Sequence, residues 1–424
     1  MQPAQNSCAQ NSCAAAAHNP RAALIRALVI GLIGFLTLID LFGTQAILPT
    51  LAQHYGVMPS TMGVAVNAST IGMAIAGLVV GLLSRNLNRR KGIWLNLALL
   101  SIPTALLAHA PDIQSFFALR VVQGVFMASA FTLTIAYLAE QCTAEAATAA
   151  LAAYVTGGVA SNLFGRLAAS SVSGSFGIVT NFYVFAALNL LGAILVFLSL
   201  KSTTPMEAMG SVRTSPFASW ALHLRNGALR SCFCIGFLIL FAFIGTFTYI
   251  NFVLARAPLN LSPMALGLVY FVFVPSMVTT PLAGKIARRL GARTAFWASL
   301  GLAALGLPLI LLPHLVPVLL GLAVIGVGTF FAQATATGFV GRAAKTERAA
   351  ASGLYLAAYY FGGLVGAAVI GQIFDHLGWT ASVIAIAISL GLAALMAATL
   401  KMQPSSNAEA KIDGLANSMS HGIR

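Results

Sequence analysis

The residue most suited to chemistry in this sequence is Asp40, an acid inside the apolar stretch IGFLTLIDLFGTQAILP (Ile33–Pro49). The chain has nine Asp and Glu residues, and the others fall in tails, loops or expected helix ends. A carboxylate deep in a membrane-spanning helix costs about 2.5–3.5 kcal/mol, and such groups commonly bind ions or relay protons. Asp40 is therefore our first candidate for a proton-binding group.

Arg120 and Arg166 are the two basic residues that also fall within apolar segments. At about 1.5 Å per residue, Asp40, Arg120 and Arg166 lie roughly 13, 10 and 9 Å from the same expected membrane surface. Removal from water favours a neutral carboxyl group, whereas a nearby guanidinium group favours the carboxylate. An acid that gains and loses such a partner as the protein moves would bind and release a proton. The alternative is a permanent Asp–Arg bridge that only holds helices together.

Uncharged polar residues and tyrosines supply further candidates for a ligand site. They occur in apolar segments, where amide and hydroxyl groups suit a cavity for a small amphipathic ligand. We expect this cavity to include Gln45, Asn67, Gln123, Asn162, Thr248, Tyr249, Gln333, Tyr355 and Tyr359. For each residue taken alone, ordinary packing between helices is the alternative.

One helix face combines small and polar residues with Arg166. Counting from Gly158, positions i, i+3, i+4, i+7 and i+8 are Gly158, Ser161, Asn162, Gly165 and Arg166. Lipid offers no polar partners, so such a face lies against protein or a water-filled cavity.

The elements that must position these residues are membrane helices. Of the 424 residues, 59% are hydrophobic and only 8% are charged, whereas soluble domains carry about 25% charged residues. The sequence predicts an all-α membrane protein with twelve transmembrane helices. The apolar segments are 23–51, 60–83, 92–110, 113–139, 146–172, 178–200, 231–253, 264–284, 294–312, 315–338, 349–374 and 380–400.

The basic residues indicate how the chain crosses the membrane. If the N-terminus is cytoplasmic, all but three of the 23 Lys and Arg residues fall in cytoplasmic tails and loops. The exceptions are Arg120 and Arg166, within segments, and Arg256, outside. The positive-inside rule therefore predicts that both termini are cytoplasmic. The net charge of +14 reflects this topology, and we do not expect a nucleic-acid partner.

Enzymatic and ATP-driven functions are not expected. The seven His residues fall in tails, loops or helix ends, and the five Cys residues do not pair with them at a metal-like spacing. All five lie on the predicted cytoplasmic side, where disulfides are rare. The sequence has no GxxxxGK[ST] loop. We therefore expect no cofactor or metal; the expected partners are a small-molecule substrate, protons and the lipid bilayer.

An internal repeat divides the chain. The stretch GLLSRNLNRRKGIW (81–94) recurs as GKIARRLGARTAFW (284–297), with matches such as Gly81 with Gly284, Arg90 with Arg293 and Trp94 with Trp297. This repeat predicts two homologous six-helix bundles, 21–200 and 230–400, with disordered tails 1–20 and 401–424. Two such bundles form one complete carrier, so we expect a functional monomer.

The linker 201–229 between the bundles contains Ser215-Pro216, a helix-start signal, followed by apolar residues at helical spacing. This pattern predicts an interfacial helix on the membrane surface. A plain linker is the alternative.

The repeated basic loop, placed after a glycine and between the second and third spans of each half, resembles the signature of the major facilitator superfamily. The segment ALRVVQGVFMASAFT (118–132) is similar to that family's fourth helix. The tracts 161–170 and 336–367 resemble YnfM-type inner-membrane transport proteins of bacteria, which are grouped with proton-coupled exporters. The resemblance covers about residues 21–400. It implies secondary active transport by alternating access in the bacterial inner (plasma) membrane. Antiport efflux is the first expectation, and proton-linked uptake of a nutrient or organic anion is the alternative.

The same resemblance assigns a gating role to the two basic loops. The residues concerned are Gly81, Arg85, Arg89, Arg90, Gly284, Arg288 and Arg293. The family has an acid where this sequence has Arg85 and Arg288. These arginines either serve only orientation in the membrane or take a partner such as Glu140 or Glu347.

Overall fold

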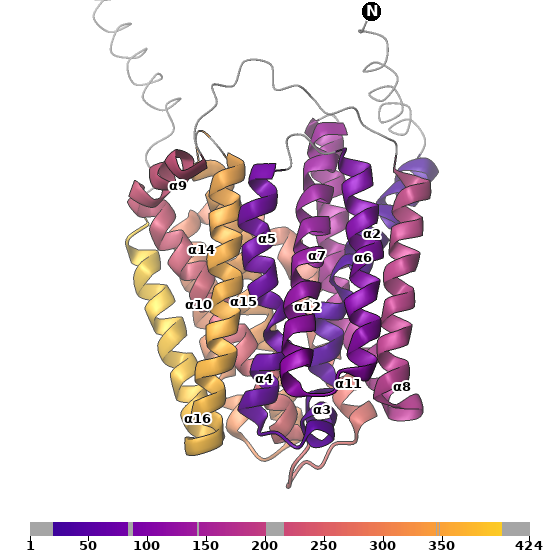
Figure 1. Ribbon diagram of the computed structural model, residues 1–424. Coiled ribbons are helices and arrows are strands. Elements are labelled where there is room, and N and C mark those ends of the chain that lie inside the picture. The colour runs from indigo at the N-terminus through magenta and orange to yellow at the C-terminus, as the bar shows by residue number, and fades with distance from the viewer. Residues whose placement is uncertain are drawn as a thin grey trace, which may run out of the picture.

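A computed structural model describes residues 20–83, 88–141, 144–200, 216–344, 346 and 348–400 of the chain. Regular secondary structure in this part is entirely helical, and the helices form one bundle (Figure 1). Apart from Pro20, the predicted tails 1–20 and 401–424 lie outside the described residues. Linker residues 201–215 and Arg85 also lie outside them.

The helices of each half follow the order of the predicted segments. The N-terminal half contains α2 (Pro20–Ala46), α3 (Leu48–Tyr55), α4 (Pro59–Asn67), α5 (Ser69–Leu83), α6 (Arg89–Leu106), η2 (Leu107–His109), α7 (Ile113–Gln141) and α8 (Ala144–Ser199). The C-terminal half contains α9 (Pro216–Arg225), α10 (Gly227–Leu254), α11 (Pro263–Val269), η3 (Tyr270–Phe273), α12 (Val274–Thr279), η4 (Thr280–Leu282), α13 (Ala283–Leu290), α14 (Ala292–Gly306), η5 (Leu309–Leu311), α15 (Leu315–Ala343) and α16 (Arg348–Ala398).

Ten stretches in the described chain are long and apolar enough to cross a membrane. Two of them, Ala150–Ser199 and Ala350–Ala398, have 50 and 49 residues. At 1.5 Å per residue each measures about 75 Å, more than twice the hydrocarbon core of about 30 Å. Gly177 (φ 85°, ψ 172°) and Gly378 (φ 81°, ψ −175°) interrupt their helical geometry with a positive φ that glycine adopts readily. Each stretch therefore divides into two crossings, which is consistent with the twelve predicted helices.

Prolines divide some predicted segments into shorter helices. The first segment, predicted as 23–51, consists of α2 and α3, and Pro49 lies in the first turn of α3. The predicted segment 264–284 consists mainly of α11, η3, α12 and η4, with Pro275 and Pro281 at the starts of α12 and η4. Proline has no amide proton to donate, so it favours the first helical turn over the interior.

The two halves repeat one pattern of close helix packing. Helix α2 packs along α8 in the first half, and α10 packs along α16 in the second. A Cβ atom at Gly157 of α8 would overlap the backbone oxygen of Gly31 in α2. A Cβ atom at Gly362 of α16 would likewise overlap the backbone oxygen of Phe237 in α10. Glycine at these crossings lets the two backbones touch, which is how small residues bring membrane helices together.

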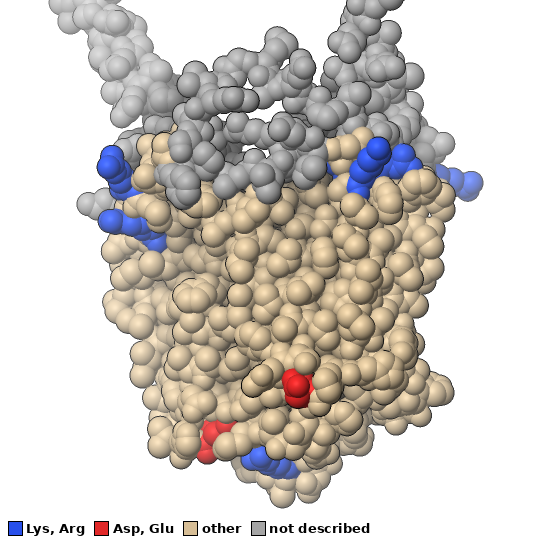
Figure 2. All heavy atoms as spheres, in the orientation of Figure 1, with Lys and Arg blue, Asp and Glu red and all other residues tan. Residues whose placement is uncertain are grey.

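Charged residues distinguish the two ends of the bundle. On the face shown in Figure 2, Lys and Arg gather at one end, whereas acidic residues and a smaller basic area lie near the other. We call the first the basic end, where α6 begins at Arg89, and the second the far end, which includes Asp112 and Arg256. Helix α9 lies across the basic end (Figure 1) and exposes Leu222 and Leu224. That this helix lies on the membrane surface stays a prediction.

Candidate functional site

Arg120 of α7 is fully buried, and all three of its guanidinium nitrogens donate hydrogen bonds within the N-terminal half. Its Nε donates to the backbone oxygen of Val66 (2.9 Å), and Nη2 donates to Oγ of Ser69 (3.1 Å). Its Nη1 donates to Oε1 of Gln123 (2.7 Å) and to the backbone oxygen of Asp40 (3.2 Å). Arg120 thereby ties α7 to α2, α4 and α5.

The Asp40 side chain is 2% exposed, and its Oδ2 atom makes no hydrogen bond within the described chain. Its polar neighbours are Asn189, Arg120 and Thr104. Oγ1 of Thr104 accepts hydrogen bonds from Nε2 of Gln123 (2.7 Å) and Nδ2 of Asn189 (3.1 Å). The predicted approach of Arg120 to Asp40 is present, but the hydrogen bond is to the Asp40 backbone. The carboxyl group can therefore change protonation without breaking a hydrogen bond to a guanidinium group.

Arg166 of α8 is also fully buried, but its guanidinium group has a different environment. Its Nη2 donates to Oε1 of Gln45 (2.5 Å) and to Oδ1 of Asn162 at a long 3.4 Å. Its Nε and Nη1 atoms make no hydrogen bond within the described chain. Three ring centroids lie 4.1, 5.5 and 5.6 Å from the guanidinium carbon, those of Tyr270, Phe273 and Phe42. Aromatic faces and amides, rather than a carboxylate, thus surround this cation.

A chain of hydrogen bonds runs from Arg166 across the two halves. Nε2 of Gln45 donates to Oδ1 of Asn67 (2.7 Å), and Nδ2 of Asn67 donates to Oγ1 of Thr248 (3.1 Å). The same Nδ2 donates to the backbone oxygen of Gly63 (2.8 Å), which orients the Asn67 amide. Thr248 belongs to α10, so this chain, which we call the amide bridge, links predicted site residues of both halves.

Two further contacts join the halves toward the far end. Nδ2 of Asn251 donates to the backbone oxygen of Gln45 in the other half (3.4 Å), while the Tyr270 hydroxyl of its own half donates to Oδ1 of Asn251 (2.6 Å). Asp375 of α16 accepts a hydrogen bond from the backbone N–H of Ser60 (3.1 Å), in the first turn of α4. A carboxylate at a helix N-terminus is favourable because it faces unpaired N–H groups and the positive end of the helix dipole. The far end is therefore closed by contacts between the halves.

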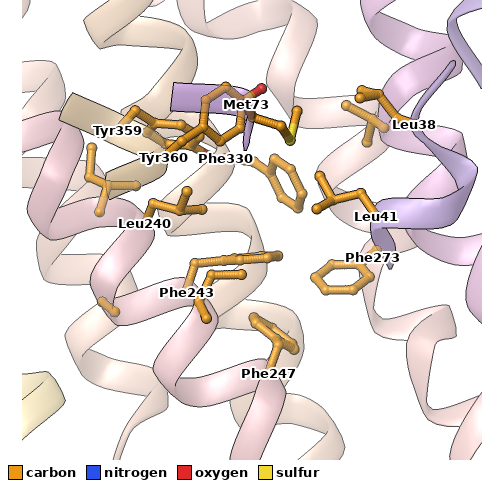
Figure 3. Close-up of a cluster of buried hydrophobic side chains, with 14 of the residues drawn as sticks. Leu38, Leu41, Met73, Leu240, Phe243, Phe247, Phe273, Phe330, Tyr359 and Tyr360 are labelled. Atoms are coloured by element: carbon orange, nitrogen blue, oxygen red, sulfur yellow. The ribbon is translucent and has the colours of Figure 1, made fainter. Parts of the chain in front are cut away.

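An aromatic cluster of the C-terminal half lies beside Arg166, which belongs to the N-terminal half. Neighbouring ring centroids within it are 4.7 to 5.9 Å apart, and its members are Phe243, Phe247, Phe273 and Phe330. Leu41 of α2 points toward this cluster from the other half (Figure 3). The boundary between the halves thus has an apolar part next to the polar residues of the amide bridge.

Four predicted cavity residues have other surroundings. Tyr249 donates its hydroxyl proton to the backbone oxygen of Ala367 (2.5 Å), so it joins α10 to α16. Tyr355 and Tyr359 stack on each other in α16 with centroids 6.0 Å apart. Gln333 of α15 is half-buried. In the described part of the chain, these residues lie outside the amide bridge, and their role in ligand binding stays a prediction.

The predicted gating loops place two arginines in similar settings. Arg89 and Arg90 begin α6, and the Arg90 guanidinium carbon lies 4.7 Å from the ring centroid of Phe197. At the matching position of the other half, the Arg293 guanidinium carbon lies 4.3 Å from the ring centroid of Trp297. Both halves therefore stack the repeated arginine on an aromatic ring at the basic end.

The remaining gating residues lie partly outside the described chain. Gly81 and Gly284 belong to α5 and α13. The side chains of Arg288, Glu140 and Glu347 lie outside the described residues. An acidic partner for the repeated loop arginines accordingly stays a prediction.

Sequence reasoning missed several residues of this region. Asn189 and Asn251 lie in otherwise apolar helices. A search for polar residues in apolar segments, which identified Asp40, would therefore have found them as well. Thr104 gives a weaker signal, because threonine in membrane helices usually bonds to its own backbone, as Thr104 also does. Tyr270 and the aromatic cluster carry no specific signal, since aromatic residues are common in any apolar helix.

The sequence matches the family model of the Major Facilitator Superfamily over residues 30–274 and 250–417. The chain belongs to the Major Facilitator Superfamily. Members of this superfamily are membrane transporters rather than enzymes, as the sequence predicted. The predicted family and fold class are thereby confirmed.

Bacterial relatives within the superfamily match nearly the whole chain. The MFS-type transporter YybF of Bacillus subtilis (strain 168) is 25% identical over 386 residues, covering 88% of this chain and 94% of the relative. The inner membrane transport protein YnfM of Escherichia coli (strain K12) is 26% identical over 371 residues, covering 87% and 88%. This chain is thus a multi-pass membrane transporter.

Solved structures show the same fold. A bacterial homologue of the human lysosomal transporter Spinster, inward-facing and unoccupied, has a TM-score of 0.74 at 13% identity, covering 90% of this chain and 99% of that chain. The nucleoside transporter NupG (D323A mutant) has a TM-score of 0.70 at 15% identity, covering 90% and 100%. At these identities the likeness establishes the major facilitator fold and leaves the substrate open.

Proposed function

We propose that this member of the superfamily is a proton-coupled secondary transporter that exports a small amphipathic compound in exchange for protons. The observation that carries the proposal is Asp40, a 2% exposed acid whose Oδ2 atom lacks a hydrogen bond in the described chain. Such an acid is costly in a membrane, which favours a role in proton movement. Asn189, Thr104 and Arg120 surround it, so small helix movements would change its affinity for a proton.

Alternating access would act through the contacts between the halves. A conformation open at the far end requires the Asn67–Thr248 and Asn251–Gln45 hydrogen bonds to break. Gln45 lies little more than one helical turn after Asp40 on α2. A movement of α2 that breaks the Gln45 contact would therefore also move Asp40. Proton binding that favours one conformation over the other is the linkage that transport requires.

Topology and direction follow from sequence patterns. We infer that the basic end faces the cytoplasm, with both termini there, because basic loops are retained on that side. The inner-membrane location rests on the likeness to the inner membrane transport protein YnfM. The export direction rests on the resemblance of the sequence to exporters. We further propose that residues 21–200 and 230–400 act as the two moving units, joined by 201–229, within a functional monomer.

The test uses everted membrane vesicles with an imposed proton gradient and a pH-sensitive dye. Cationic drugs, organic acids and sugars are added in turn to vesicles that contain the wild-type protein or the Asp40→Asn variant. We expect at least one compound to dissipate the gradient in wild-type vesicles, because its transport releases protons. The same compound should have little effect with Asp40→Asn.

Two outcomes would contradict the proposal. Full proton exchange in the Asp40→Asn variant would remove Asp40 from the coupling mechanism. Proton movement only when substrate and protons travel in the same direction would replace export with proton-linked uptake. Equal amounts of both proteins in the vesicles, measured by immunoblot, are the control.

A further inference from the structure

We propose that Arg166 is the anion-binding residue of the substrate site, and that the substrate is an organic carboxylate with an apolar body. This inference rests on the proposed transport function and names the substrate class for the same site. It separates the two buried arginines, which the sequence alone treated as equivalent.

The two arginines differ in how their N–H groups are used. Arg120 donates from Nε, Nη1 and Nη2 to partners within its own half, so each of its guanidinium nitrogens helps to hold helices together. Arg166 donates only from Nη2, whereas its Nε and Nη1 atoms make no hydrogen bond within the described chain. The Tyr270 hydroxyl gives its own proton to Asn251, and its oxygen is close enough to this guanidinium group to accept one hydrogen bond from it. Arg166 therefore keeps donors that a ligand can use.

The chemistry of these donors selects an anion. A guanidinium group stays charged in proteins, and burying a cation without a counter-ion costs several kcal/mol. Ring faces and amide oxygens offset part of that cost at Arg166, since Tyr270 lies 4.1 Å from its guanidinium carbon. A carboxylate would supply the missing negative charge and accept a charge-assisted hydrogen bond from Nε or Nη1.

The surroundings of Arg166 indicate the rest of the ligand. Phe273 contacts the guanidinium group and belongs to the aromatic cluster that continues along the boundary between the halves. A carboxylate bound at Arg166 would thus place its body against phenylalanine rings, which favours an aromatic or aliphatic chain. Gln45 and Phe42 belong to one half and Tyr270 to the other. A ligand bound there would contact both moving units.

The test measures binding to the full-length purified protein in detergent by the shift in its thermal unfolding. The probes are three carboxylates (benzoate, phenylacetate and hexanoate) and their matched amides (benzamide, phenylacetamide and hexanamide), all at constant ionic strength. We expect at least one carboxylate to bind wild type about 10-fold or more tightly than its amide, because a charge-assisted contact is worth about 1.5–3 kcal/mol. The comparison within wild type requires no variant to fold.

Three variants locate the contact. Arg166→Gln should bind that carboxylate about 10- to 100-fold more weakly and lose its preference over the amide. Arg166→Lys, which keeps the charge, should retain part of the preference. Arg256→Gln removes an exposed positive charge at the far end and should bind like wild type. Size-exclusion chromatography confirms that each variant is folded.

The outcomes separate this inference from the proposed function. Amides that bind as tightly as carboxylates, carboxylates that fail to bind wild type, or an unchanged preference in Arg166→Gln would each overturn the anion site. None of these results depends on proton movement in vesicles. Conversely, a carboxylate that binds through Arg166 but never moves protons would support the site and refute proton-coupled export.

Discussion

We predict that the amide bridge stabilises the conformation of this transporter in which the far end is closed. Thr248 of α10 accepts a hydrogen bond from Asn67 of α4 at 3.1 Å, and both side chains are fully buried. The substitution Thr248→Val removes the acceptor and nearly preserves the shape of the side chain. It should therefore weaken the closure of the far end without creating a cavity.

The size of the effect follows from the partners that remain. Nδ2 of Asn67 still donates to the backbone oxygen of Gly63 at 2.8 Å, so the amide is not left without a partner. The loss is then that of one ordinary hydrogen bond, about 1 kcal/mol. This corresponds to about a fivefold shift in the ratio of far-end-open to far-end-closed molecules.

Electron–electron distance measurements between two spin labels can detect this shift. Gln53 of α3 and Met264 of α11 are exposed far-end positions on opposite halves, and each can carry a label on an introduced cysteine. The native cysteines are first replaced by serine. We expect Thr248→Val to raise the ratio of molecules with long label–label distances to those with short distances about fivefold, relative to the labelled protein that keeps Thr248.

A matched control lies on the same helix. Thr246 is also fully buried, and its Oγ1 atom makes no hydrogen bond within the described chain. Thr246→Val makes the same chemical change without removing a contact, so its distance distribution should match the parent. If Thr248→Val and Thr246→Val gave identical distributions, the amide bridge would not hold the far end closed.

Two other properties can be tested by thermal unfolding in detergent. Gly157→Ala should destabilise the protein by about 1–3 kcal/mol, because its Cβ atom would overlap the backbone of α2. The control is Gly391→Ala, where nothing lies within 4 Å of an added Cβ atom, and this variant should be as stable as wild type or more stable. At the far end, the Asp112 carboxylate accepts a hydrogen bond from the backbone N–H of Ser115 at 2.7 Å, which lowers the pKa of Asp112 below its ordinary 3.8. Its contribution to stability is present above pH 3.8 and is lost as the pH falls through the lowered pKa. Asp112→Asn should therefore lose less stability than wild type between pH 5 and pH 2, a range chosen to bracket carboxyl titration; equal losses would contradict this role.

The different use of the two buried arginines has a consequence for the mechanism. Arg120 belongs to a rigid set of contacts around α2, α4, α5 and α7, and its replacement should disturb folding as well as transport. Arg166 bonds to the amide bridge and faces rings of the other half. Its interactions would change whenever the halves separate, which suits a residue that binds substrate in one conformation and releases it in another.

Several features were predictable from sequence because they depend on local composition. Apolar length identified the crossings, and the repeat of the basic loop identified two similar halves. The deep acid Asp40 was visible because a charge in an apolar helix is expensive wherever that helix packs. The breaks at Pro275 and Pro281 could also have been predicted, since proline disfavours helix interiors regardless of tertiary context.

Only the tertiary structure decided which polar groups meet. The hydrogen bond between Asn67 and Thr248 joins residues 181 positions apart, and no periodicity in either helix indicates it. The sequence placed Asp40, Arg120 and Arg166 at similar depths, but depth does not specify direction. Arg120 reaches a backbone oxygen of α2, whereas Arg166 reaches Gln45 and the rings of the other half. Hydropathy reports how deeply a residue is buried, whereas the partner of each N–H group depends on how separate helices rotate and cross.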